Sequence, residues 1–196
     1  MLIGHNHEVA IPERTTERLL LRAFRDADRN RFVAMNADPV VMEHLPSALD
    51  RPASDALLDR IANGWNSEGL GLWAVERVAD GRLLGFTGLS RPTFEAHFTP
   101  AVEVGWRLSK DAWGHGYATE AARAALEFGF DEIGIDEIVS FTVPANVPSR
   151  RVMDRLGMTH DTADDFDHPR LPEGHRLRRH VLYRLASRDW DRPRGA

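Results

Sequence analysis

The stretch EVGWRLSKDAWGHGYATE, residues 103–120, constrains the fold more than any other part of the sequence. It predicts a strand that carries one carboxylate, Glu103, then a loop that contains Gly114 and Gly116, and then the first turn of a helix. The first amides of a helix have no intrahelical partner and carry a partial positive charge, so glycines before them let an anion approach the backbone closely. The loop is therefore a candidate phosphate site, next to a strand on which Glu103 is the odd polar residue.

Two common phosphate-binding loops do not fit this stretch. A Walker loop needs Lys and then Ser or Thr after its second glycine, whereas Tyr117, Ala118 and Thr119 follow Gly116 here. A dinucleotide fingerprint of the GxGxxG type lacks its third glycine, and no clear βαβ unit with an acidic ribose partner follows. A nucleotide-binding protein is therefore disfavoured.

Composition narrows the class of protein. A chain of 196 residues is long enough for one domain with a hydrophobic core, and two domains would each be marginal. No apolar run approaches the roughly 20 residues that span a bilayer, so we expect no membrane partner. The basic residues are scattered and the formal net charge is -5, which argues against nucleic-acid binding. The absence of cysteine and of a signal-peptide pattern favours a cytoplasmic location.

Hydrophobic periodicity predicts the order of the elements. The expected strands cover residues 17–24, 70–78, 82–90, 101–108, 135–143, 158–162 and 178–185. The expected helices cover residues 26–36, 39–45, 54–66, 117–130 and 149–156. Asp80-Gly81 between two apolar runs predicts a hairpin. This order indicates an α+β fold with a single domain, built on a mixed, mostly antiparallel sheet that is flanked by helices.

Two segments resemble a known family. Residues 113–118, WGHGYA, resemble motif A of the GCN5-related N-acetyltransferases (GNAT superfamily), whose pattern is Gln/Arg-x-x-Gly-x-Gly/Ala; Gly116 and Ala118 match, and Trp113 replaces the first residue. The string WGHGYATEAARAALEFGF is similar to the ribosomal-protein N-terminal (RimJ/RimL-like) acetyltransferase branch, and NVPSRRVMDRLGM resembles a second family segment. The resemblance implies the acyl-CoA N-acyltransferase fold over residues 14–187, with an N-terminal arm at 1–13 and a C-terminal tail at 188–196.

The same resemblance implies that acetyl-CoA donates its acetyl group to a primary amine, which is a protein N-terminal α-amine or a small molecule. Backbone amides of the glycine loop would bind the pyrophosphate, and the strand before the loop would bind the pantetheine arm. The residues that it assigns to CoA binding are Trp106, Leu108, Gly114, His115, Gly116, Tyr117, Ala118, Thr119 and Asn146. No metal is expected.

The acceptor amine needs a base, because alkylamines are mostly protonated at neutral pH and only the neutral form attacks a thioester. Glu103 is the expected general base, with a pKa raised by partial burial. A backbone N–H of Val104 or Gly105 is the expected donor to the oxyanion. The alternative is that Glu103 only forms an ion pair with Arg91 or Arg107.

The departing CoA thiolate benefits from a proton donor. Many relatives use a tyrosine on the last helix, but Met153 stands at that position here, so Ser149 is the expected acid. The alternative is that Ser149 only caps its helix. An acidic segment follows, in which the carboxylates attract a cationic acceptor or are simply solvated: Asp161, Asp164, Asp165 and Asp167.

Two further questions stay open at this level. A non-catalytic acyl-CoA-binding or sensing module would keep the glycine loop and Asn146 but would not need Glu103. A homodimer is compatible with the predicted strand edges, although no sequence feature specifies one.

Overall fold

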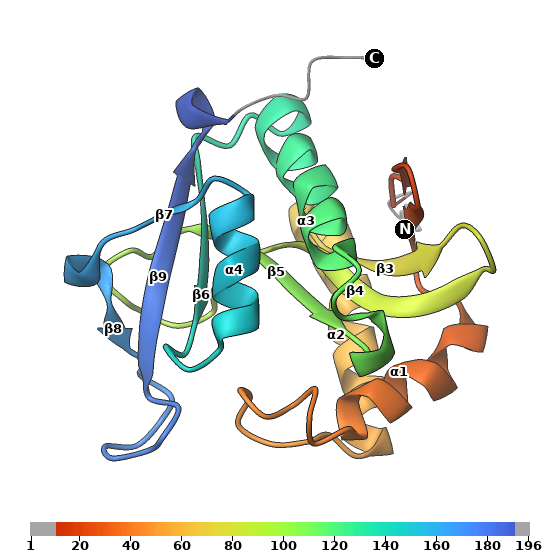
Figure 1. Ribbon diagram of the computed structural model, residues 1–196, viewed down its shortest axis with the longest axis horizontal. Helices are drawn as coiled ribbons and strands as arrows, with labels where there is room; N and C mark the ends of the chain where they lie inside the picture. The colour runs from red at the N-terminus through yellow and green to blue at the C-terminus, as the bar shows by residue number, and fades with distance from the viewer. Residues whose placement is uncertain (1–10, 191–196) are drawn as a thin grey trace, which may run out of the picture.

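The computed structural model describes residues 11–190 (Figure 1). The expected N-terminal arm at 1–13 and C-terminal tail at 188–196 lie mostly outside these residues, so the domain limits stay a prediction. No helix within residues 11–190 is long and apolar enough to cross a membrane.

Among the described residues, nine strands form one sheet in the order β1-β2-β3-β4-β5-β6-β9-β7, with β8 paired to β9. Every neighbouring pair is antiparallel except β5 and β6, which are parallel. The predicted fold class, an α+β domain with a mixed and mostly antiparallel sheet, is therefore confirmed. The strands are β1 Arg14–Thr15, β2 Leu19–Arg22, β3 Leu72–Arg77, β4 Arg82–Ser90, β5 Val102–Leu108, β6 Glu137–Thr142, β7 Thr159–His160, β8 Phe166–Asp167 and β9 Arg179–Ala186.

Helices cover both faces of this sheet, and Figure 1 shows α3 in front of β4 and β5 with α2 behind them. The helices are α1 Arg29–Ala37, α2 Arg51–Glu68, α3 Tyr117–Glu127 and α4 Val147–Arg155. The short helical turns are η1 Asp26–Asp28, η2 Lys110–Ala112, η3 Phe128–Glu132, η4 Thr162–Asp164 and η5 Ser187–Asp189. The sheet face of Val102 and Val104 packs against α3 and α4, whereas the face of Ala74 and Phe86 packs against α1 and α2.

The helix expected at residues 39–45 is wrong, because the chain makes only turns there. The Met42 amide donates to the Asp38 carbonyl (3.0 Å), which makes one helical turn, but the Leu45 amide then donates to the Met42 carbonyl (2.9 Å) and the helix does not continue. Pro46 follows, and the two β-branched valines of the segment are poor helix formers, so the segment is too short to propagate a helix.

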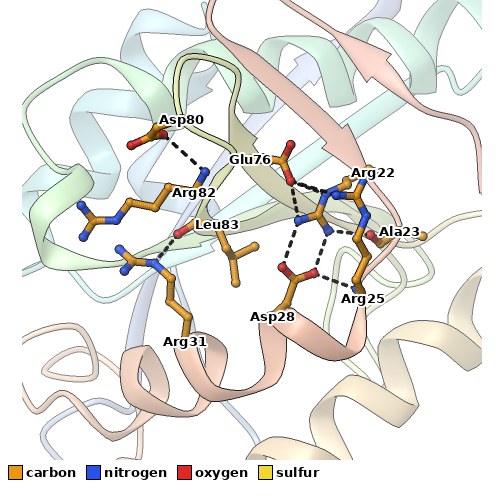
Figure 2. A network of polar contacts seen from close by, with 9 residues as sticks. All are labelled: Arg22, Ala23, Arg25, Asp28, Arg31, Glu76, Asp80, Arg82 and Leu83. Atoms are coloured by element: carbon orange, nitrogen blue, oxygen red, sulfur yellow. Dashed lines mark hydrogen bonds and ion pairs between the residues drawn. The ribbon is translucent and has the colours of Figure 1, made fainter.

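A buried ion network fixes the start of α1 against the sheet (Figure 2). The Arg22 guanidinium on β2 donates to both oxygens of Asp28 (2.7 and 2.9 Å) and to Glu76 on β3 (2.7 Å). Burial raises the pKa of Asp28, but hydrogen bonds from Arg22 and from the Arg25 amide outweigh it and hold that pKa below its usual value. The network thereby sets where α1 lies on this face of the sheet.

The sheet opens between β5 and β6. These strands pair at Val102–Ile138 and Glu103–Val139, whereas β4 and β5 pair over six residues each, from Gly85–Leu108 to Ser90–Glu103. Beyond Glu103 the two strands diverge, and residues of both line one cavity. The opening lies directly after the residue that the sequence singles out as a base.

Candidate active site

The cavity has a volume of about 590 Å³ and lies at the opening between β5 and β6. Its wall combines β5, β6, the glycine loop, the start of α3, one side of α4 and the turn after α1. The structure brings these predicted site residues into the lining: Glu103, Trp106, Leu108, Gly114, Gly116, Tyr117, Ala118, Thr119, Asn146 and Ser149. His115 is the one predicted site residue that does not line the cavity, and its carbonyl accepts a hydrogen bond from Arg18 (3.0 Å).

The glycine loop has the backbone that an anion site requires. Gly114 and Gly116 have φ values of 78° and 82°, in the left-handed region that favours glycine. The first helical hydrogen bond of α3 runs from the Glu120 amide to the Gly116 carbonyl (3.0 Å), so the three preceding amides have no intrahelical acceptor. These amides and the positive end of the α3 dipole adjoin the cavity, which fits a phosphate group.

Two side chains that sequence reasoning missed hold this loop in place. The Trp113 indole donates to the Leu108 carbonyl (2.8 Å), which ties the loop to the end of β5. Arg18, far away in sequence, donates to the His115 carbonyl and also to Glu120 (2.7 Å) in the first turn of α3. A local signal exists for Trp113, which replaces a polar residue of the family pattern, but none exists for Arg18.

Glu103 is half-buried and lines the cavity. The expected structural alternative is wrong, since Arg91 lies 3.6 Å from Glu68 and Arg107 donates to Asn36 (2.7 Å). No residue within 11–190 forms a hydrogen bond or an ion pair with the Glu103 carboxyl group. Burial raises the pKa of Glu103 to about 8, so the group exchanges its proton near neutral pH.

Asn146, not Ser149, caps α4. The Asn146 side-chain oxygen Oδ1 accepts from the Ser149 amide (3.3 Å), and the side-chain nitrogen Nδ2 donates to the Thr142 hydroxyl (2.9 Å). Helix α4 therefore starts at Val147, two residues before the expected start, and the alternative in which Ser149 caps the helix is wrong. The Ser149 hydroxyl lines the cavity without a hydrogen-bond partner in the described part of the chain, and the neighbouring Met153 is buried.

The acidic segment lies apart from this cavity, and its carboxylates are engaged elsewhere. None of its four aspartates is a lining residue. Asp164 contacts Arg184 (2.6 Å), Asp165 contacts His160 (2.7 Å), Asp167 contacts Arg178 (3.2 Å) and Asp161 accepts from the Ala163 amide (2.9 Å).

Comparison with known proteins identifies the family. The family model for the acetyltransferase (GNAT) domain matches residues 18–159, which include β5, the glycine loop and α4. The chain belongs to the GNAT acetyltransferase family.

Relatives and solved structures agree with this assignment. The protein YkkB of Bacillus subtilis is 31% identical over 73% of this chain and 83% of its own length. The FsC-acetyl coenzyme A-N(2)-transacetylase of Aspergillus fumigatus is 30% identical over 92% of this chain and 79% of its own length. A GNAT acetyltransferase from Bacillus anthracis superposes with a TM-score of 0.75 at 25% identity, covering 90% of this chain and 99% of that one.

This chain is thus an acyltransferase, and its family uses acetyl-CoA. The glycine loop fits the co-substrate: a Cβ added to Gly114 would have no atom within 4 Å, so the space beside the loop amides is open. The acetyltransferase cavity also continues from the loop along β5 to Glu103, which leaves room for the pantetheine arm.

Proposed function

We propose that this acetyltransferase moves the acetyl group of acetyl-CoA to a primary amine, which is a protein N-terminal α-amine or a small-molecule amine, by direct attack. The observation that supports this most is Glu103. Its half-buried carboxyl group has no protein partner within residues 11–190, and it lies in the same cavity as the free amides of the glycine loop. A raised pKa suits a base that must take a proton at neutral pH.

The loop amides from Gly114 to Thr119 would bind the pyrophosphate oxygens. The pantetheine arm would then lie in the opening between β5 and β6, where the backbone near Trp106 and Leu108 would pair with its amides. Asn146 would contact the arm from the opposite side, held in place by its bonds to Thr142 and Ser149.

The chemistry then needs three groups. Glu103 takes a proton from the ammonium group, directly or through water, and the neutral amine attacks the thioester carbonyl. A backbone N–H of Val104 or Gly105 stabilises the oxyanion. The C–S bond breaks, and Ser149 gives its proton to the CoA thiolate and takes the remaining proton from the nitrogen of the tetrahedral intermediate, so that a neutral amide and CoA thiol result.

The class of acceptor rests on two similarities. The string at residues 113–130 is similar to that of ribosomal-protein N-terminal acetyltransferases. The Aspergillus fumigatus relative is named for N-acetylation from acetyl coenzyme A. Both describe acetyl transfer to nitrogen, and we infer that this protein does the same in the cytoplasm.

A thiol-release assay with acetyl-CoA against a panel of amines and N-terminal peptides tests this function, together with calorimetric titration of CoA. We expect CoA binding and turnover of at least one acceptor. CoA binding without any turnover would indicate a sensing module instead. Failure to bind CoA would contradict both the proposed reaction and the assignment of the glycine loop.

A further inference from the structure

Arg107 is a second charged group in the active-site cavity, four residues after Glu103 on β5. Its side chain is half-buried, and its guanidinium donates to the Asn36 side-chain oxygen (2.7 Å) and lies over the Phe86 ring (5.1 Å to the centroid). Neither partner is an anion. Burial lowers the pKa of Arg107 to about 10, as expected for a cation that no carboxylate compensates.

Arg22 differs from Arg107 in having carboxylate partners. Arg22 is buried near the same face of the sheet, and it has two carboxylate partners, Asp28 and Glu76. Arg107 has none within residues 11–190, and four of its five N–H groups have no acceptor there. A half-buried cation without a counterion is less favourable than one whose charge a ligand's anion neutralises.

The floor between Glu103 and Arg107 is free of side chains. The two residues lie on one face of β5 with Gly105 between them, and Gly105 pairs across the strands with Gly88. A Cβ added to Gly105 would contact only Glu103 Oε1 at 3.9 Å, so this floor is open. With a rise of about 3.4 Å per residue, the two Cα atoms are about 14 Å apart, and the Glu103 carboxyl group extends part of the way, over Gly105.

We propose that Arg107 binds a carboxylate of the acceptor, so that the preferred acceptor is an amine whose carboxylate is separated from the nitrogen by a chain of several bonds. The proposal rests on the proposed function, because the amine is placed at Glu103. The guanidinium fork matches a carboxylate, and the open space over Gly105 accommodates the intervening chain.

Acceptor pairs that differ only in charge test this inference. Initial rates are compared for ω-amino carboxylates of increasing length and their neutral primary amides, and for N-terminal peptides with Glu or Gln at an early position. We expect wild-type kcat/KM to favour the carboxylate by at least about tenfold at one chain length, because a hydrogen bond to a charged group is that strong. The two arms distinguish a small molecule from an acidic peptide.

Arg107→Gln should reduce this ratio to about one, and Arg107→Lys should keep part of it because the charge remains. Arg31→Gln is the matched control: Arg31 also joins α1 to the sheet, through the Leu83 carbonyl (2.5 Å), but it does not line the active-site cavity, so the ratio should not change. A loss of folding in Arg107→Gln would lower both rates, whereas the ratio reports the carboxylate alone.

A wild-type ratio near one at every length, or a ratio that persists in Arg107→Gln, would overturn the inference. Should no acceptor be turned over, calorimetric titration of the ω-amino carboxylates into the CoA-loaded protein decides the question. Binding that Arg107→Gln abolishes would support the carboxylate site while the proposed function fails. Absence of binding would overturn the carboxylate site as well.

Discussion

At the scale of single residues, the burial of Glu103 determines both its pKa and the pH range in which it can act as a base. It lies on an apolar strand, half-buried and without a partner in the described part of the chain, so burial raises its pKa to about 8. The protonated form therefore dominates below that pH and cannot act as a base. A carboxylate with a pKa of about 8 is also a stronger base than an ordinary one, which helps it to take a proton from the ammonium group of the acceptor.

The acid limb of kcat/KM should therefore have its midpoint near pH 8, and activity should rise with pH through that value. The measurement needs an acceptor whose amine stays protonated through this range, such as a lysine-like alkylamine with a pKa of about 10, so that only Glu103 titrates near pH 8. Glu103→Gln should remove this limb and lower kcat by about 100-fold, with CoA affinity unchanged. A variant with wild-type rates at every pH would exclude Glu103 as the base.

The stability of the same variant gives an independent readout. A carboxyl group whose folded pKa is raised above 4.5 to about 8 lets stability fall as pH rises between these values. Glutamine does not ionise, so the Glu103→Gln variant does not lose stability in this way as the pH rises. Its melting temperature should therefore equal that of the wild type near pH 4 and exceed it increasingly up to about pH 8. A constant difference across this range would mean that Glu103 has an ordinary pKa.

At the scale of elements, the loop between β5 and α3 is stabilised both by its own glycines and by side chains that contact it, one of them distant in sequence. The loop conformation comes from Gly114 and Gly116, while Trp113 and Arg18 hold it against β5 and α3. Burial raises the pKa of Glu120, but hydrogen bonds from Thr16 and Arg18 outweigh it and hold the pKa below its usual value. The carboxylate therefore stays ionised in the first turn of α3, where the helix dipole favours it.

Gly116→Glu should weaken CoA binding by at least about tenfold, because it places a carboxylate beside the amides that would bind phosphate. Gly157→Glu is the matched control, since Gly157 has the same left-handed backbone (φ 80°), open space around it and no place in the cavity lining. Both changes should lower the free energy of unfolding by about 1 kcal/mol, but only the first should affect CoA titration. If the two variants bound CoA equally well, the glycine loop would not be part of the CoA-binding site.

At the scale of the whole molecule, the buried Arg22 network connects β2, η1 and β3 and sets the place of α1. Helix α1 in turn carries Asn36, which holds Arg107 in the cavity. The acceptor side of the site thus depends on a network that does not itself line the cavity.

Arg22→Met should lower the free energy of unfolding by about 3–5 kcal/mol, because it leaves the Asp28 carboxylate buried without an ion-pair partner and leaves Glu76 with only the exposed Arg25 (3.3 Å). Arg29→Met is the control: Arg29 also contacts two carboxylates, but its side chain is 40% exposed against 3% for Arg22, so the loss should stay below about 1 kcal/mol. Denaturant unfolding measures both. Similar losses in the two variants would show that burial of the network is unimportant for stability.

Local stereochemistry made much of this protein predictable from its sequence. The Asp80-Gly81 hairpin is confirmed, and Gly81 has the positive φ (67°) that only glycine adopts easily. The glycine loop and the end of α4 at Gly157 follow from the same preference. Strand alternation placed Glu103 on the face opposite Val102 and Val104. Each of these features depends on residues that are close in sequence.

Only the tertiary structure decided which distant groups meet. Arg18 forms a hydrogen bond with Glu120, 102 residues away in the sequence. Arg107 donates a hydrogen bond to Asn36, 71 residues away, and not to Glu103 on the same strand. The divergence of β5 from β6, which opens the cavity, likewise has no local signal. Dihedral preferences act within a few residues and can be read from the chain, whereas the pairing of long side chains depends on how the sheet and helices bring remote segments together.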